Sequence, residues 1–192
     1  MRIPRVIQIT DETVLAREDL LARVSRMRPG HAVQLRDPQL SGRALIQLGH
    51  ELRRRTRDVG ARLVVNDRID VALCVEADGV HLGRLSVAAG DARTLLPDGI
   101  ITCSAHGIEE VLAAQRAGAD AVLLSPIFAS PGKGTPLGVE ALRQARAAAP
   151  EIVVIALGGV TAESASLCVE AGAGGVASIR ADLTAIPLSS QG

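Results

Sequence analysis

The chain has 192 residues, 47% of them hydrophobic, which is enough for one well-buried core and short for two domains. Lys plus Arg and Asp plus Glu number 21 each, so no net field is available to hold nucleic acid or an anionic membrane surface. Trp and Tyr are absent and Phe128 is the single Phe, which removes the stacking platform that single-stranded nucleic acid requires.

No export signal or membrane span is predicted, and we expect a cytoplasmic protein. The opening residues, MRIPRVIQITDE, reach acidic side chains before an apolar segment develops, and no stretch approaches the roughly 18 apolar residues of a spanning helix. The three cysteines lie far apart, without the spacing of a zinc site or a disulfide framework. We expect buried free thiols at Cys74, Cys103 and Cys168.

Eight short apolar segments recur along the chain and are predicted to be β-strands. They are continuous rather than alternating in hydrophobicity, which is typical of parallel strands covered by helices. The predicted strands are residues 5–10, 32–36, 62–66, 79–82, 100–104, 121–125, 152–157 and 175–179.

Amphipathic helices are predicted between these strands. In residues 41–60 and 107–120 apolar side chains return every three or four positions, and a glycine lies near the end of each segment. Strict alternation over eight units favours one closed (βα)8 TIM barrel over residues 1–192. The rival is an open doubly wound sheet, which lacks the expected Gly-rich fingerprint after its first strand.

Polar residues follow the predicted strands, where a barrel would gather them at one mouth. Gln34 and Arg36 lie two apart and share a strand face, while Arg36 alone could equally be a solvated charge. Asn66 and Asp67 end the third strand and can bind a polar ring edge or Mg²⁺. Asp67 could also form a turn or cap the helix that follows.

Two later segments have the character of anion sites. Residues 125–138 form the longest Gly/Pro/Ser loop and carry one cation, Lys133, suited to closing over an anionic ligand, although a plain surface loop is the alternative. Gly158 and Gly159 precede a helix predicted from about Ala162, and their backbone N–H groups suit a phosphate. A tight turn would need the same glycines.

Histidines are placed by the same argument. His31 and His50 fall away from the mouth and are expected to be structural or exposed, whereas His81 and His106 fall at it. His106 is a substrate-binding candidate, but neither mouth histidine has an evident carboxylate partner, so we assign no proton transfer to them.

These motifs together resemble the thiamine-phosphate synthase and thiazole tautomerase superfamily, and the resemblance runs almost end to end. It rests on VNDR, ADGVHLG and SPIF in this order and spacing, together with QITD, QLR, CSAH, IALGGV and AGAGGVASI. The resemblance implies a barrel enzyme that joins hydroxymethylpyrimidine pyrophosphate to a thiazole phosphate, with Mg²⁺ and release of pyrophosphate. Its ligands would be small phosphorylated heterocycles.

The resemblance also implies a role for each matched residue. Gln34 would contact the pyrimidine, and Ser104 the pyrimidine or the pyrophosphate. Asp67 would bind the metal. Ser130 and Gly159 would meet the thiazole phosphate, with Gly158 beside them. The pyrophosphate would be held by Arg36, Asn66 and Lys133, which are the catalytic candidates.

Several positions depart from the family pattern. Pro38 replaces a pyrophosphate-binding Lys, Ser86 a second metal carboxylate, and Arg180 a phosphate-binding Ser, so Mg²⁺ binding is weakened while Arg180 supplies a compensating charge. The tautomerase alternative lacks its proton-shuttling His, which is Pro126 here. A third alternative is a catalytically silent binding homologue.

The C-terminal end is short. Only ADLTAIPLSSQG follows Arg180, too little for a full closing helix. We expect the last groove of the barrel to be covered by a short turn or by a second subunit of a homo-oligomer.

Overall fold

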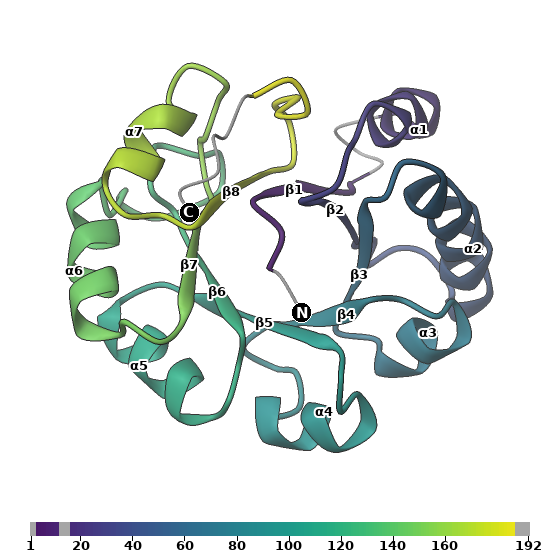
Figure 1. The fold of residues 1–192 in the computed structure, drawn as a ribbon, viewed down its shortest axis with the longest axis horizontal. Helices are drawn as coiled ribbons and strands as arrows, with labels where there is room; N and C mark the ends of the chain where they lie inside the picture. The colour runs from purple at the N-terminus through teal and green to yellow at the C-terminus, as the bar shows by residue number, and fades with distance from the viewer. Residues whose placement is uncertain (1–2, 12–15, 187–192) are drawn as a thin grey trace.

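The computed structural model describes residues 3–11 and 16–186, in which eight parallel strands close into a barrel in chain order (Figure 1). Each strand pairs with the next, and β8 pairs with β1 through Val176 and Val6. The closed (βα)8 barrel is confirmed, and the open sheet is wrong. The strands are β1 (Val6–Ile9), β2 (His31–Leu35), β3 (Arg62–Asn66), β4 (Gly79–Leu82), β5 (Ile100–Ala105), β6 (Ala121–Leu124), β7 (Val153–Ala156) and β8 (Gly175–Ser178).

Helices surround the strands on the outside of the ring (Figure 1). None in the described part of the chain is both long and apolar enough to cross a bilayer. No helix follows β8 as far as Ile186, where the described residues end. The helices are α1 (Arg17–Ser25), α2 (Gly42–Asp58), α3 (Ile69–Cys74), α4 (Ala89–Leu95), α5 (Ile108–Arg116), α6 (Glu140–Ala148) and α7 (Ala165–Glu170).

The longest helix, α2, shows how the sequence sets these elements. Ser41 caps it by accepting a hydrogen bond from the Ala44 N–H, and Leu45, Leu48 and Leu52 form its buried stripe. Gly49 lets the helix approach α3, since a Cβ there would lie 2.8 Å from Val75 Cγ1.

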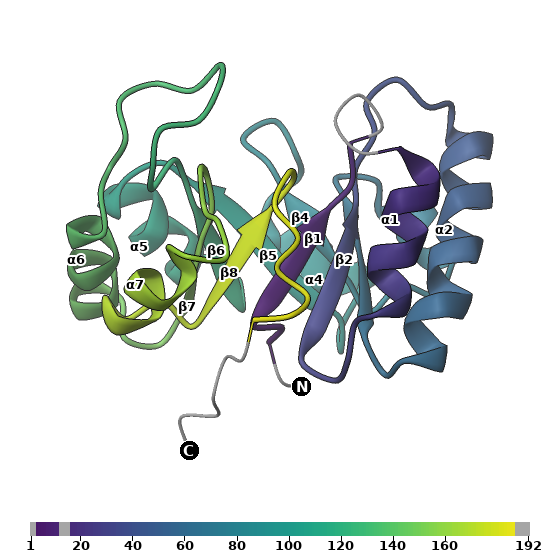
Figure 2. The same ribbon diagram turned by 90° about the horizontal axis from the view of Figure 1, so that it is seen from above.

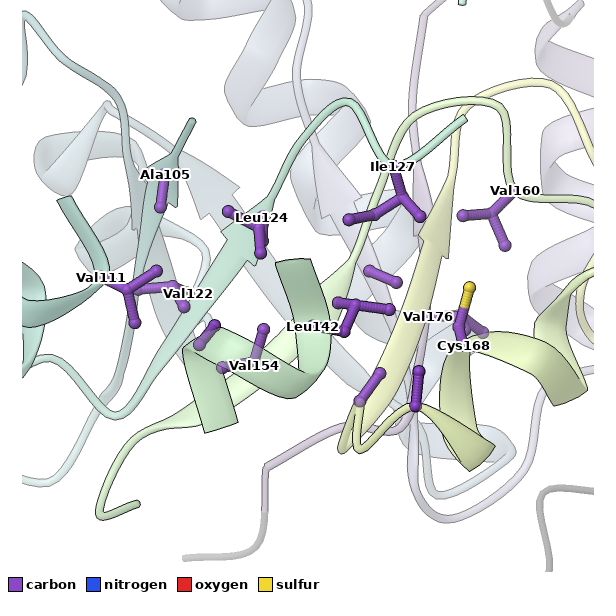
Figure 3. Close-up of a cluster of buried hydrophobic side chains, with 14 of the residues drawn as sticks. Ala105, Val111, Val122, Leu124, Ile127, Leu142, Val154, Val160, Cys168 and Val176 are labelled. Atoms are coloured by element: carbon purple, nitrogen blue, oxygen red, sulfur yellow. The ribbon is translucent and has the colours of Figure 1, made fainter. Parts of the chain in front are cut away.

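Alternate residues of each strand face opposite sides of the barrel wall. The outward residues pack under the helices in two clusters, one under α1 to α4 and one under α5 to α7. Figure 3 shows part of the second cluster, in which Leu142 of α6 and Cys168 of α7 pack with Val176 of β8. A third cluster has no helix member and fills the inside of the ring, formed by Ile7, Ile9, Ala32, Val64, Ala121, Leu123, Ile155 and Ala177.

The cysteines are free, as expected, but not all are buried. Cys168 is buried and Cys103 partly so, and burial raises the pKa of the Cys168 thiol to about 11. Cys74 is exposed, so the expectation of burial is wrong there: α3 turns Val71 and Ala72 to the core and leaves Cys74 on its outer side.

Candidate active site

The barrel mouth is the end of the ring where the strands finish and the loops after them begin. Side chains alternate between the two faces of each strand, and this alternation decides which polar residues meet at the mouth. Side chains in phase with the inner cluster point inward: Gln34 follows Ala32, Asn66 follows Val64, and Ser125 follows Leu123. On β4 and β5 the outward residues are Val80, Leu82 and Ile101, so His81, Thr102 and Ser104 face inward. The predicted site residues Gln34, Asn66 and Ser104 therefore share one inner surface with His81, Thr102 and Ser125.

Gln34 and Asn66 are joined directly. Gln34 Nε2 donates to Asn66 Oδ1 at 3.1 Å, and Gln34 Oε1 is buried with no partner in the described residues. That carbonyl is a ready acceptor for an amino group of a ligand, since a buried polar atom without a partner is costly.

Arg36 and Asp67 line a cavity of about 250 Å³ together with Asn66, which we call the diphosphate pocket. Its other members are Asp37, Pro38, Leu40, Leu45, Val65 and Arg68. The Arg36 guanidinium lies 3.8 Å from Asp11, and its backbone is fixed by Thr10, whose hydroxyl accepts from the Arg36 N–H at 2.8 Å. The Arg36 guanidinium therefore lies in the pocket lining with Asp11 as its carboxylate neighbour.

Asp67 stands in a tight turn with φ of 63°, and its N–H donates to the His81 carbonyl at 2.8 Å. The turn is confirmed, but the cap is wrong: Arg68 occupies the N-cap of α3 and no side chain caps that helix. The Asp67 carboxylate is exposed at the edge of the pocket. Within the described residues no group of three or more His, Cys, Asp or Glu gathers as a metal site.

His81 links β4 to β5 through two hydroxyls. Its Nδ1 lies 2.9 Å from Thr102 Oγ1 and its Nε2 2.9 Å from Ser104 Oγ. Burial, with the positive charge of Arg36 nearby, lowers the pKa of His81 to about 4, so the ring is neutral at pH 7. A neutral ring held on both sides orients the Ser104 hydroxyl rather than supplying charge.

His106 is the one mouth histidine with a carboxylate partner, and the expectation that it has none is wrong. Its Nδ1 lies 3.1 Å from Glu110 Oε2 one helical turn later, a pairing set by the start of α5. Both side chains are about half exposed, at 49% and 51%. His106 borders a separate groove, which Ser86 and Ser104 also line. It does not line the diphosphate pocket.

The loops after β6, β7 and β8 enclose a second cavity at the mouth, of about 290 Å³, which we call the phosphate pocket. It brings together the predicted residues Ser130, Gly158, Gly159 and Arg180. Both glycines have positive φ, of 91° and 63°, and a Cβ on Gly159 would lie 2.5 Å from the Ala129 carbonyl oxygen. Only glycine fits there.

The helix after these glycines begins later than predicted, because α7 starts at Ala165 rather than about Ala162. The Thr161 N–H is already bound by Ser164 Oγ at 2.9 Å. Local hydrogen bonding among Thr161 and Ser164 therefore replaces the first helical turn.

Lys133 lines neither pocket. It lies exposed in the connection between β6 and α6, which stands out from the mouth in Figure 2. Ser125, at the base of the same connection, is 4% exposed and its Oγ has no partner in the described residues.

Sequence reasoning missed the residues that support the site from outside the barrel. Gln8 and Arg23 are hydrogen-bonded at 3.2 Å behind the phosphate pocket, and Thr10 holds Arg36. Their contacts join residues distant in sequence, and only the polar Gln8 inside an apolar strand gave a signal.

Comparison with known proteins agrees with this geometry. The family model described as thiamine monophosphate synthase matches residues 6–181. A thiamine-phosphate synthase of Moorella thermoacetica is 44% identical over 78% of this chain and 73% of its own length, and one of Methanoculleus marisnigri is 41% identical over 90% and 84%. The solved thiamine phosphate pyrophosphorylase of Pyrococcus furiosus superposes with a TM-score of 0.83 at 31% identity, over 95% of this chain and 91% of that one. The chain therefore belongs to the thiamine monophosphate synthase family.

Proposed function

We propose that this protein is a thiamine-phosphate synthase that couples hydroxymethylpyrimidine pyrophosphate to a thiazole phosphate. The observation that carries the proposal is the pair of anion pockets at one barrel mouth, one lined by Arg36 and Asn66, the other by Gly158, Gly159 and Arg180. Two phosphorylated substrates need two such pockets. Curated relatives named as synthases favour this reaction over the tautomerase alternative.

The reaction is a dissociative transfer. The bond from the pyrimidine methylene carbon to the pyrophosphate oxygen breaks, and both electrons leave with pyrophosphate. The thiazole nitrogen then donates its lone pair to the resulting pyrimidine cation and forms the new C–N bond. Such a reaction needs charge stabilisation of the leaving group more than it needs a general base. Arg36 in the diphosphate pocket and Arg180 in the phosphate pocket supply positive charge at the mouth.

Residues in different parts of the mouth bind different parts of the two substrates. Arg36 and Asn66 bind the departing pyrophosphate, and Lys133 joins them when its loop closes over the mouth. Gln34 offers its buried Oε1 to the amino group of the pyrimidine, while Ser104, held by His81, contacts the same substrate. Ser130, Gly158, Gly159 and Arg180 bind the thiazole phosphate, and His106 borders the entrance.

Mg²⁺ fits this donor set as an ion shared with the substrate. Mg²⁺ is commonly held by one or two carboxylates together with substrate phosphates, not by a complete protein cage. Asp67 supplies one such carboxylate at the edge of the diphosphate pocket. Ser86 has a hydroxyl in place of a second carboxylate, and its Oγ accepts a hydrogen bond from the Gly83 N–H at 2.8 Å. The ion would neutralise charge on the leaving pyrophosphate, and Asp67 would hold it there.

The remaining features of the proposal concern the whole protein. The chain acts as one barrel domain in the cytoplasm on small phosphorylated heterocycles, without nucleic acid or membrane as a partner. A homo-oligomer is compatible with a segment after β8 that contains no helix as far as Ile186.

Incubation of the purified protein with both substrates and Mg²⁺ tests the function through pyrophosphate release. We expect turnover with both substrates, and in Asp67→Asn a higher Mg²⁺ requirement with little change in melting temperature. Absence of pyrophosphate release rules the synthase out. Aromatisation of thiazole carboxylate phosphate, monitored by its absorbance, would indicate the tautomerase. Binding of the substrates without either reaction would indicate the silent homologue.

A further inference from the structure

The segment after β8 forms one wall of the phosphate pocket without the support of a helix. Residues 177–181 line the pocket, and from Ile179 to Ile186 the backbone is neither helix nor strand. In Figure 1 this yellow segment lies in the part of the outer ring between α7 and α1. Its position must therefore come from side-chain contacts.

Two residues hold the part of the segment that faces the pocket. Arg23 reaches from α1 across the joint between β1 and β8, and its Nη1 donates to the Arg180 carbonyl at 2.9 Å and to Gln8 Oε1 at 3.2 Å. Gln8, only 2% exposed, donates through Nε2 to the Ile179 carbonyl at 2.8 Å and the Ser178 carbonyl at 3.2 Å. Three successive carbonyls are thus fixed by one connected pair.

Other arginines hold the segment farther from the pocket. Arg26 binds Asp182 at 2.7 Å, and Arg28 donates to the Ile186 carbonyl at 2.7 Å. Leu183 is 2% exposed and packs into the core under α5 to α7. Arg23 Nε also lies 3.9 Å from Asp182 Oδ2, a longer contact than that of Arg26 with the same carboxylate. Because Arg26, Arg28 and Leu183 still hold the segment on the barrel when Arg23 is changed, the main effect of Arg23 is expected at the pocket wall.

We propose that Arg23 is a positioning residue for the phosphate pocket: with Gln8 it fixes the backbone from Ser178 to Arg180 before a phosphate arrives. A wall that is loose in the free protein must be ordered by the ligand, which weakens binding. The diphosphate pocket lies between β2 and β3 and does not share this wall. The inference rests on the proposed function only for the identity of the ligand, the thiazole phosphate.

The test compares Arg23→Met with Arg17→Met. Arg17 lies on the same helix but binds Glu51 of α2 at 2.8 Å, so Arg17→Met controls for the loss of an α1 arginine. We expect Arg23→Met to raise the KM for thiazole phosphate at least fivefold. The KM for the pyrimidine pyrophosphate and kcat at saturation should stay within twofold, and Arg17→Met should match the wild type. Arg23→Lys, which keeps the charge on a shorter side chain, replaces Arg23→Met if that variant does not fold.

Inorganic phosphate provides a second readout that does not require turnover. Its Kd is taken from the amide chemical shifts of Gly159 and Arg180, so that only this pocket is observed. We expect a Kd at least fivefold weaker in Arg23→Met and unchanged in Arg17→Met. Unchanged phosphate binding in Arg23→Met, or an equal loss for both substrates, overturns the inference even when the wild type makes thiamine phosphate. If the wild type makes no thiamine phosphate, yet Arg23→Met still binds phosphate at least fivefold more weakly than the wild type, the proposed function is wrong and the inference stands.

Discussion

Single residues at the mouth are fixed by backbone shape as much as by side-chain chemistry. Gly159 combines a φ of 63° with a carbonyl oxygen 2.5 Å from where a Cβ would be, and Gly158 meets Pro126 in the same way at 2.7 Å. The loops after β6 and β7 can therefore touch only because both residues lack a side chain. Gly159 and Ala129, which meet in this contact, both line the phosphate pocket.

Gly159→Ala should destabilise the protein by about 2–4 kcal/mol, because a left-handed backbone and a backbone clash act together. Gly134→Ala is the matched control: it lies in the exposed β6–α6 connection, and a Cβ there meets nothing within 4 Å. Urea denaturation of both variants measures the free energy of unfolding. Equal stability of the two variants would show that the loops separate without cost.

The sequence predicted the position of those site residues that lie at the ends of strands. Gln34, Asn66 and Ser104 lie where alternation along a strand requires, and the glycine pair lies in the second pocket. The partner of His106 was not recognised, although Glu110 follows at helical spacing. Gln8 and Arg23 were missed because their hydrogen bonds depend on which helix lies beside which strand pair.

Among the elements, the connection between β6 and α6 carries the most distinctive charge. Twenty of the 21 basic residues are Arg, and Lys133 is the single Lys of the chain. Its ammonium is a compact, strongly hydrated charge, suited to a phosphate that arrives and leaves. Lys133 is exposed and lies outside both pockets, so the proposed function requires its loop to close before Lys133 can reach the pyrophosphate.

Lys133→Met should raise the KM for the pyrimidine pyrophosphate about tenfold, the effect of losing roughly 1.4 kcal/mol of a charged contact. Its free energy of unfolding should change by less than about 0.5 kcal/mol, because the side chain is exposed. Steady-state kinetics and urea denaturation provide the two measurements. Reductive methylation with ¹³C-formaldehyde labels only Lys133 and the chain's terminal amine. If the NMR chemical shift of the labelled Lys133 methyl groups does not change when pyrophosphate is added, Lys133 does not close over the pyrophosphate.

Element boundaries followed from the sequence more accurately for strands than for helix starts. The strand predicted at 79–82 is β4 as observed, and the helix predicted over 41–60 is α2 over Gly42–Asp58. The start of α7 was placed too early, because Thr161 and Ser164 satisfy each other locally before the helix begins. Short-range hydrogen bonding of this kind is weakly encoded in hydrophobic periodicity.

At the scale of the whole molecule, stability depends on two histidines that fold in the neutral form. Burial, with the charge of Arg28, lowers the pKa of His31 to about 4, and His81 has a pKa of about 4 for similar reasons. The unfolded chain binds these protons near pH 6.5, so below that pH it holds more protons than the folded chain, and stability falls with falling pH.

Between pH 7 and pH 4 we expect each histidine to remove on the order of 3 kcal/mol of stability. The loss of stability should begin below about pH 6.5 and be mostly complete near pH 4. Melting temperature measured across this range provides the test. His31→Gln should reduce the slope by about half, because it removes one of the two protonations. A flat profile from pH 7 to pH 5 would mean that the rings are protonated in the folded state.

The two helix-covered clusters divide the barrel wall into halves, and this division bears on how the reaction ends. The diphosphate pocket is backed by the cluster under α1 to α4, and the phosphate pocket by the cluster under α5 to α7. Under the proposed function each substrate would bind against one half, whereas the joined product would span both. Cys103 and Ala119 pack against both clusters and connect the two halves, so release of such a product would loosen contacts on both sides of one continuous wall.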